Sequence, residues 1–173
     1  MTGATPFWIA AKAGDASVMR LLVDGGADPQ LANNQKVTPL MIAAGVGGRG
    51  HSPVPERDAL EAVKLCVELG NDVNAADAAG ETALHGTAYR GLSGSTAIVP
   101  FLVAKGAKLN VKNQFGWTPL AIAEGIYFGG SDTRSDTAAE QLRTLGAEPT
   151  PADVERDGNV AALKARTEKA MSR

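Results

Sequence analysis

Small and apolar residues occur along this chain in paired runs, and each pair begins just after a threonine and ends at a glycine. In the first pair, Thr5 precedes an apolar run over 6–13, and a second apolar run over 16–24 leads to Gly26. Apolar positions in runs of this length and spacing predict two short helices joined by a turn. One helix pair of this size cannot bury its apolar side alone, so we expect successive pairs to stack.

The opening of these paired runs returns four times, at a period of about 33 residues. The four openings are Thr5-Pro6-Phe7-Trp8, Thr38-Pro39-Leu40-Met41, Thr82-Ala83-Leu84-His85 and Thr118-Pro119-Leu120-Ala121. Threonine before a helix can accept hydrogen bonds from free backbone N–H groups, and proline in the first turn removes no helical hydrogen bond. A glycine in the left-handed conformation is expected to end each second helix. These glycines are Gly26, Gly70, Gly106 and Gly146.

The openings, together with the turn signals Val73-Asn74-Ala75 and Asn113-x-x-Gly116, resemble the ankyrin repeat. The resemblance covers residues 5–149 and implies an all-α solenoid of stacked helix-turn-helix repeats with short β-turn or hairpin projections. The expected repeats are 5–37, 38–81, 82–117 and 118–149. Residues 150–173 are expected to form either a capping helix, over about 160–171, or a frayed tail. Lys36 stands where the turn pattern has glycine, which leaves the geometry of that turn open.

Repeats two to four are longer than the first, and their additional residues fall at one place, the joint between the two helices. Glycine, proline and serine predict loops there, over 45–58, 91–96 and 125–136. Insertions at one joint emerge along one edge of a solenoid, and long loops on a rigid scaffold often carry function. In their glycine content these repeats resemble bacterial ankyrin proteins, in which such an array is one part of a longer chain.

Composition narrows the possible partners and the chemistry. The 173 residues have a net charge of −2 and 5% aromatic residues, which gives no basic field for nucleic acid. No apolar run approaches the length of a membrane span, and no leader is evident, so a cytoplasmic location is the default, with the periplasm or export open if a leader has been trimmed. Cys66 is expected to be a buried small hydrophobe. We expect a monomer.

The front of the chain has no polar capping helix. Residues 1–4 are followed at once by Phe7 and Trp8, which we expect to belong to a stacking face that an upstream repeat would cover. The chain is therefore open to interpretation as a piece of a longer repeat array.

The sequence matches motifs for catalysis and nucleotide binding only weakly. The segment Gly45-Val46-Gly47-Gly48-Arg49-Gly50 spells a dinucleotide fingerprint, but a helix precedes it where the fingerprint needs a strand. His51 lies in the first insertion loop beside acidic and basic residues, without the spacing of a catalytic set. His85 occupies the histidine position of the repeat, and the resemblance implies that it hydrogen-bonds a neighbouring turn. No cofactor, no metal site and no enzymatic activity are expected.

Aromatic residues on the expected turn tips are the better functional signal. Trp117 and Tyr89 are candidates for solvent-facing interface anchors, because aromatic residues and arginine dominate binding hot spots. The alternative is that Trp117 folds back and covers the neighbouring turn. The resemblance implies a concave surface made of turn tips and the exposed flank of each first helix, which binds another protein. Its residues are Lys12, Asn34, Gln35, Val37, Glu81, Tyr89, Arg90, Gln114, Phe115, Trp117, Ile126 and Tyr127.

Two other functions stay open. The insertion loops could form a small-ligand or weakly hydrolytic pocket, and its candidate residues are Arg49, His51, Arg57 and Asp58. Alternatively, the segment only spaces or caps a larger assembly. Protein–protein recognition without catalysis is the interpretation that the repeats favour.

Overall fold

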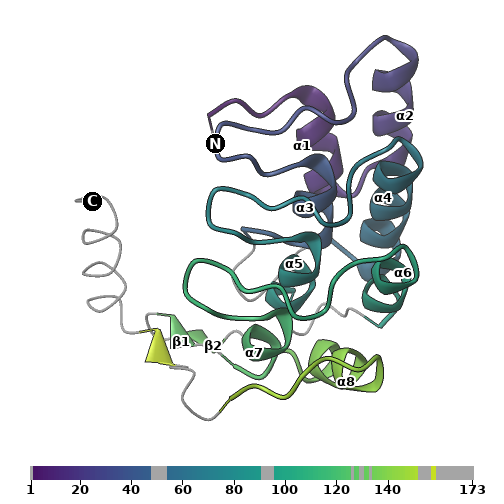
Figure 1. Ribbon diagram of the computed structural model, residues 1–173. Helices are drawn as coiled ribbons and strands as arrows, with labels where there is room; N and C mark the ends of the chain where they lie inside the picture. Colours follow the sequence, from purple (N-terminus) through teal and green to yellow (C-terminus); the bar gives the residue numbers. More distant parts are fainter. Residues whose placement is uncertain are drawn as a thin grey trace, which may run out of the picture.

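The computed structural model describes residues 2–47, 54–90, 96–125, 127–128, 131–132, 134–151 and 157–158. Within these residues, eight helices form four antiparallel pairs stacked one on the next, so the all-α solenoid is confirmed (Figure 1). The first helices of the pairs are α1 (Pro6–Ala13), α3 (Pro39–Ala44), α5 (Ala83–Tyr89) and α7 (Pro119–Ala123). The second helices are α2 (Ala16–Asp24), α4 (Glu56–Glu68), α6 (Ile98–Ala104) and α8 (Asp136–Thr144).

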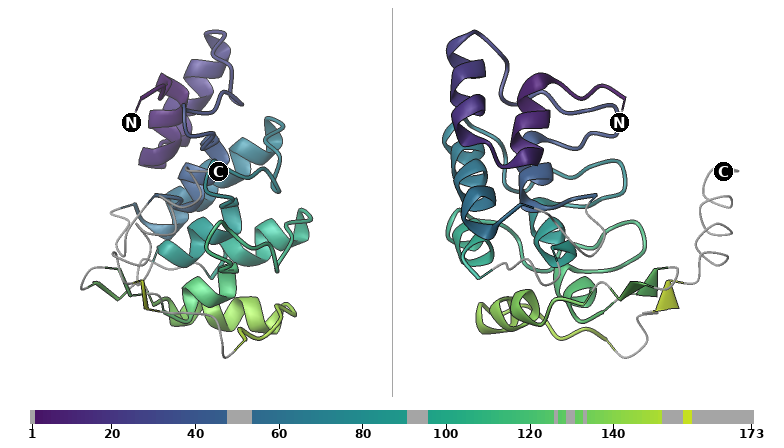
Figure 2. Two further views of the ribbon diagram at one scale, coloured as in Figure 1. Left: turned by 60° about the vertical axis from the view of Figure 1, so that its left-hand side comes forward. Right: turned by 180° about the vertical axis from the view of Figure 1, so that it is seen from behind.

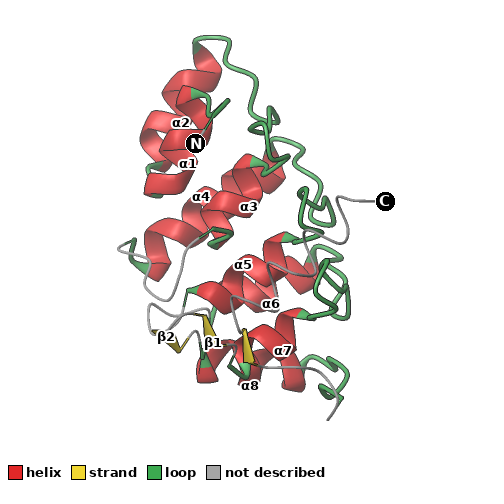
Figure 3. Ribbon diagram, turned by 90° about the vertical axis from the view of Figure 1, so that its left-hand side faces the viewer, coloured by secondary structure: helices red, strands yellow, loops and turns green. Residues whose placement is uncertain are grey.

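The pairs build two parallel columns of helices. Figure 2 shows the first helices in one column and the second helices in another, while the turns between repeats all project to the side away from the second column. Viewed from the side of those turns, the four repeats follow one another in chain order along the stack (Figure 3). The turns therefore form one continuous edge of the molecule.

Helix starts and stops follow the sequence signals. The Oγ1 atoms of Thr5, Thr38 and Thr118 accept hydrogen bonds from the backbone N–H three residues later, at 3.1, 3.2 and 3.1 Å. The glycine after each second helix has a φ of 88 to 92°, the left-handed conformation that closes a helix. These four glycines are Gly26, Gly70, Gly106 and Gly146. Local chemistry therefore sets the boundaries of the pairs.

Small residues allow the repeats to approach closely. Ala10, Ala43, Ala88 and Ala123 are all buried between layers, as the stacking argument requires. The second and third repeats approach closely at Gly86 on α5, where an added Cβ would lie 2.7 Å from the backbone nitrogen of Val46. Any side chain at position 86 would push the second and third repeats apart.

The expected exposure of the first helix is wrong. Phe7 and Trp8 are 0% and 1% exposed, because both rings point into the stack of this chain and not towards an upstream layer. The large apolar residues that face solvent in the first repeat are instead Ile9, Val18, Leu21 and Leu31, at 55%, 41%, 70% and 52% exposed.

Two of the insertion loops differ from expectation in the described residues. Helix α4 begins at Glu56, so Arg57 and Asp58 belong to its first turn and not to a loop. In the third insertion, strand β1 (Tyr127–Phe128) pairs antiparallel with β2 (Ser131–Asp132) and parallel with β3 (Asp157–Gly158). Two-residue strands carry no alternating pattern, which is why the sequence did not indicate them. The expected capping helix over 160–171 lies outside the described residues.

No helix in the described part of the chain is both long and apolar enough to cross a membrane.

Candidate functional site

The turns between repeats share one hydrogen-bonded design. We call residues 33–37, 77–81 and 113–117 tips 1, 2 and 3. Each tip begins with Asn33, Asp77 or Asn113, whose side-chain Oδ1 accepts from the backbone N–H groups two and four residues later, at 2.8 to 3.1 Å. The backbone N–H of the same residue donates to the carbonyl four residues later, at 3.0 to 3.1 Å. The side chain therefore fills the inside of the turn and fixes its shape.

Consecutive tips are also joined to one another. The backbone N–H of Ala78 donates to the carbonyl of Gln35 at 2.9 Å, and that of Gln114 donates to the carbonyl of Ala79 at 2.8 Å. At the start of the chain, the N–H of Asn34 donates to the carbonyl of Thr2 at 3.2 Å. These bonds make a backbone ladder along the projecting edge and hold the tips at a fixed spacing.

Lys36 does not break this pattern. It has a φ of 61°, in the left-handed region that Gly80 and Gly116 occupy at 77° and 80° in the other two tips. Tip 1 keeps the same ring of hydrogen bonds as the other tips, so the question that the sequence left open is answered by a common geometry. A lysine in the left-handed region carries backbone strain, which glycine at the equivalent positions does not.

Two of the tips are tied to the preceding first helix by a ring nitrogen. Nε1 of Trp8 donates to the carbonyl of Val37 at 2.9 Å, and Nε2 of His85 lies 3.1 Å from the carbonyl of Trp117. The backbone N–H of Thr82 donates to Nδ1 of His85 at 3.0 Å, so Nδ1 is an acceptor and Nε2 must carry the proton. The expected hydrogen bond from His85 to a neighbouring turn is confirmed.

Burial lowers the pKa of His85 to about 4, although its contacts with the backbone carbonyls of Trp117 and Val111 raise it. The imidazole is therefore neutral at neutral pH, in agreement with the tautomer that its two partners require. A histidine held in this way is a structural bridge and not an acid–base catalyst.

Tips 2 and 3 enclose a small polar cluster. The hydroxyl of Tyr89 donates to a carboxylate oxygen of Glu81, and Nδ2 of Asn113 lies 3.4 Å from the same oxygen. Burial raises the pKa of Glu81, against these two hydrogen bonds, which lower it. Tyr89 is 7% exposed, so the prediction that it faces solvent is wrong.

Trp117 also turns inward. It is 4% exposed because its ring lies back on the tip, 4.9 Å from the ring of Phe115 between centroids. The prediction of a solvent-facing Trp117 is therefore wrong, and Val37 at the equivalent position of tip 1 is buried as well. The exposed residues of the tips are Asn34, Gln35, Lys36, Ala78 and Gln114, and Phe115 is half-buried beside Gln114.

Arg90 is the least expected of the candidate residues. Its side chain is 1% exposed, and Nη2 donates to the carbonyl of Val54 at 2.8 Å. Burial lowers the pKa of Arg90, and the nearby carboxylate of Glu56 opposes that shift. The prediction that Arg90 lies on a binding surface is wrong, because the guanidinium bridges two repeats inside the stack.

Glu56 completes a second bridge between the same repeats. Its carboxylate accepts from the hydroxyl of Thr96 and from the backbone N–H of Ala97, both at 2.7 Å. Arg90 and Thr96 border the segment 91–95 on its two sides, Val54 borders the segment 48–53, and Glu56 lies two residues after Val54. The ends of the first two insertions are therefore joined, although sequence analysis gave no signal for a contact over 36 or 40 residues.

The remaining candidates do not come together in the described residues. Lys12 is exposed on α1, and Arg57 and Asp58 are exposed on α4. Arg49, His51 and Ile126 lie outside the described residues, and nothing is described of the side chain of Tyr127. In the part of the chain that the structure covers, no group of three or more histidine, cysteine or acidic residues is placed to hold a metal ion.

The fold and its laddered tips define a helix-pair solenoid with a continuous projecting edge. A family model of three ankyrin repeats matches residues 54–129, and a model of a single ankyrin repeat matches residues 2–34. Together they cover more than half of the sequence, and the chain belongs to the ankyrin repeat family. Ankyrin repeats are generally protein-interaction modules and generally act as non-catalytic scaffolds.

Proposed function

We propose that this chain binds a partner protein, without catalysis, through the surface formed by the exposed side chains of the three tips and the flank of the first helices. The observation that carries the proposal is the backbone ladder between tips, which fixes their spacing before any partner arrives. A surface that is rigid beforehand loses little conformational freedom on binding, so modest contacts suffice. The buried residues Val37, Trp117, Tyr89 and Arg90 support the surface from behind in this proposal.

The contact residues are then the polar side chains of Asn34, Gln35 and Gln114, together with the half-buried Phe115 and the exposed Lys12. Tip 2 contributes little to this surface except backbone atoms, because the side chains of Ala78 and Ala79 are too short to extend towards a partner. This arrangement favours a partner that contacts tips 1 and 3 with side chains and crosses tip 2 closely.

Site-specific photo-crosslinking tests the proposal. A photoreactive residue at Gln35 or Gln114 is expected to capture a partner, while the same group at Arg20 on α2 or Glu140 on α8 is not. Both control positions are exposed on second helices. Capture from the second-helix positions alone would place the interface on the opposite side of the molecule and refute the proposal.

The captured partner then allows a quantitative test. The double variant Gln35→Ala with Gln114→Ala is expected to weaken binding by about tenfold, in the range of ordinary interface contacts. Its melting temperature should stay unchanged, because both side chains are exposed. The matched control Arg20→Ala with Glu140→Ala should bind like the parent chain. Equal affinity of all three proteins would contradict the assigned surface.

A further inference from the structure

Repeat three carries lysines at positions where the other repeats have none. The comparison uses the closing glycine of each second helix as a common reference. Lys105 precedes Gly106, where the other repeats have Gly25, Leu69 and Leu145. Lys108 is the second residue after that glycine, where the others have Asp28, Asp72 and Glu148. Lys112 is the sixth residue after it, where repeats one and two have Ala32 and Ala76.

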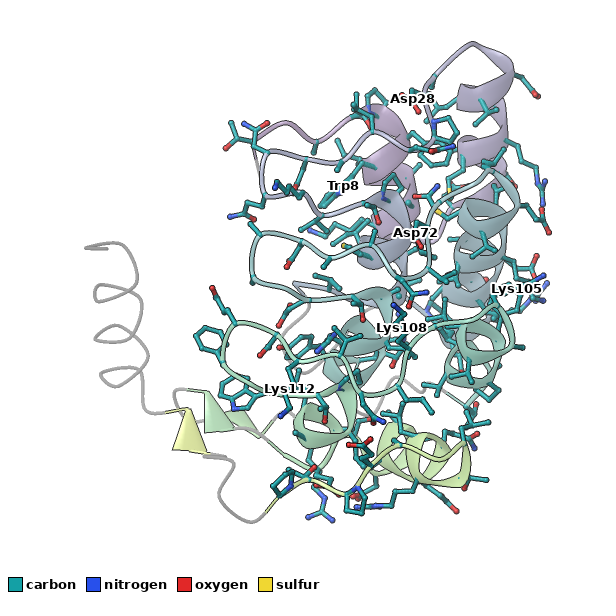
Figure 4. The ribbon with its side chains drawn as sticks, in the orientation of Figure 1. Trp8, Asp28, Asp72, Lys105, Lys108 and Lys112 are labelled. Carbon is teal, nitrogen blue, oxygen red and sulfur yellow. The ribbon has the colours of Figure 1, made fainter. Side chains whose placement is uncertain are left out.

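These three residues, which we call the lysine row, share one face of the molecule. Figure 4 shows them on the same side, in order from the end of α6, across the connecting segment, towards tip 3. All three are exposed, and none forms an ion pair with another described residue. Nζ of Lys105 lies 5.8 Å from the ring centroid of Phe101. The row is therefore available to a partner.

Stability does not account for the row as a whole. Oδ1 of Asp28 and of Asp72 accepts a hydrogen bond from the backbone N–H two residues later, at 2.8 Å in both repeats. Lysine has no acceptor, so Lys108 gives up the bond that closes the equivalent turn elsewhere. Lys105 alone is favourably placed, because a cation at the end of α6 interacts well with the helix dipole.

The surrounding charges restrict which anion fits. Asp72 in repeat two and Glu148 in repeat four stand at the register position of Lys108, one repeat to either side, and both are exposed. The positive strip is therefore one repeat wide. A nucleic acid or an anionic membrane extends past such a strip and meets these carboxylates, whereas a short acidic segment does not.

We propose that the lysine row binds a short acidic segment of a partner protein, laid across the solenoid from α6 to tip 3. The chain between Lys105 and Lys112 spans at most about 24 Å, so about seven extended residues of a partner would cover it. The row ends beside Gln114 and Phe115, which places the acidic segment next to the tip surface proposed above. The lysines themselves are not part of that surface, so either proposal can fail without the other.

Fluorescence anisotropy with a labelled heptapeptide of glutamate tests this inference directly. Binding to the full chain is expected at low ionic strength and should decline at about 0.5 M salt, where exposed charges are screened. The triple variant Lys105→Gln, Lys108→Gln, Lys112→Gln should lose at least about tenfold in affinity, which corresponds to a modest contribution from each exposed lysine. A heptapeptide of lysine should not bind.

A matched control removes the same net charge elsewhere. The triple variant Arg20→Gln, Arg57→Gln, Lys64→Gln, at positions on second helices away from the tips, should bind the acidic peptide like the parent chain, with both triple variants folded by circular dichroism. No peptide binding to the parent, or an equal loss in the two triple variants, would overturn the inference. Tighter row-dependent binding of a short DNA duplex or of phosphatidylserine vesicles would overturn the assignment to a protein partner.

Discussion

Repeats one and three use different side chains of the first helix to hold the tip that follows. Trp8 and His85 occupy the same position of their first helices, and each places a ring nitrogen against the carbonyl that ends the following tip, at 2.9 and 3.1 Å. Repeats two and four have Met41 and Ala121 there, which carry no N–H group in the side chain. Only some layers of the stack therefore need a side-chain N–H group that reaches the following tip, and either tryptophan or histidine can supply it.

The two donors differ in what they depend on. The indole of Trp8 keeps its proton at every accessible pH and fills a large volume, whereas His85 donates correctly only as one neutral tautomer. The tips that they support also differ, because tip 1 contains the strained Lys36 and tip 3 contains Gly116. Substitution of Trp8, protonation of His85 and exchange of lysine and glycine at positions 36 and 116 test three contributions to stability separately. These are side-chain volume, hydrogen bonding and backbone strain.

The largest effect is expected for Trp8→Ala. This change removes a side chain that is 1% exposed and leaves a cavity, so the free energy of unfolding should fall by about 3–5 kcal/mol. Trp8→Phe retains most of the volume but loses the bond to Val37, and it should lower stability by about 1–3 kcal/mol. Urea unfolding measures both. Equal losses would mean that the hydrogen bond, and not the volume, dominates at this layer. Ile9→Ala, at a residue 55% exposed, is the matched control and should change stability little.

Acid should weaken repeat three but not repeat one. The pKa of His85 is about 4 in the folded chain and about 6.5 when unfolded, so the unfolded state binds more protons between these values. The free energy of unfolding should therefore fall as the pH decreases from 6.5 to 4, by up to about 3 kcal/mol from this residue.

The variants His85→Gln and His51→Gln isolate that contribution. His85→Gln should flatten the decline in stability between pH 6.5 and 4, measured by urea unfolding at several pH values, while His51→Gln should retain it. Glu81 acts in the opposite direction, because its raised pKa makes its folded form easier to protonate, but it is present in both variants. A steep decline that survives in His85→Gln would show that other groups control the acid response.

The smallest effect comes from exchanging the fourth residue of tips 1 and 3. Lys36→Gly removes a left-handed lysine and should raise the free energy of unfolding by about 1 kcal/mol. Gly116→Lys should lower it by a similar amount, because an added Cβ there meets nothing within 4 Å and introduces strain alone. Thermal melts of the two variants should shift in opposite directions. Shifts of the same sign would show that lysine at this position acts through a contact and not through the backbone.

Local signals in the sequence predict most of the scaffold. The two helices of repeat one were expected over 6–13 and 16–24, and they run from Pro6 to Ala13 and from Ala16 to Asp24. Threonine caps and closing glycines act within a few residues of where they stand, so their effect can be read without knowing the fold. The start of α4 was misjudged because Pro55 before Glu56 looks like part of a loop, although proline also precedes helices readily.

The candidate surface was predicted less well, because burial depends on distant contacts. The position of Trp117 on a projecting tip suggested exposure, but its ring returns to Phe115 two residues away. Tyr89 reaches back to Glu81, and Arg90 reaches Val54 in the preceding repeat. An aromatic or cationic residue at a variable position is equally suited to an interface and to an interrepeat contact, and only the structure distinguishes the two.

The reciprocal bonds of Arg90 with Val54 and of Glu56 with Thr96 have a consequence for how this protein can change. Both bonds start from the C-terminal end of the first insertion, and they reach the two ends of the second insertion, so the helices that flank the second insertion keep their alignment whatever sequence lies between Arg90 and Thr96. New segments can then be grafted into the second insertion with little thermodynamic penalty, since loop-closure entropy grows only slowly with length. These two hydrogen bonds between repeats therefore make this edge of the array a place where new sequence can evolve.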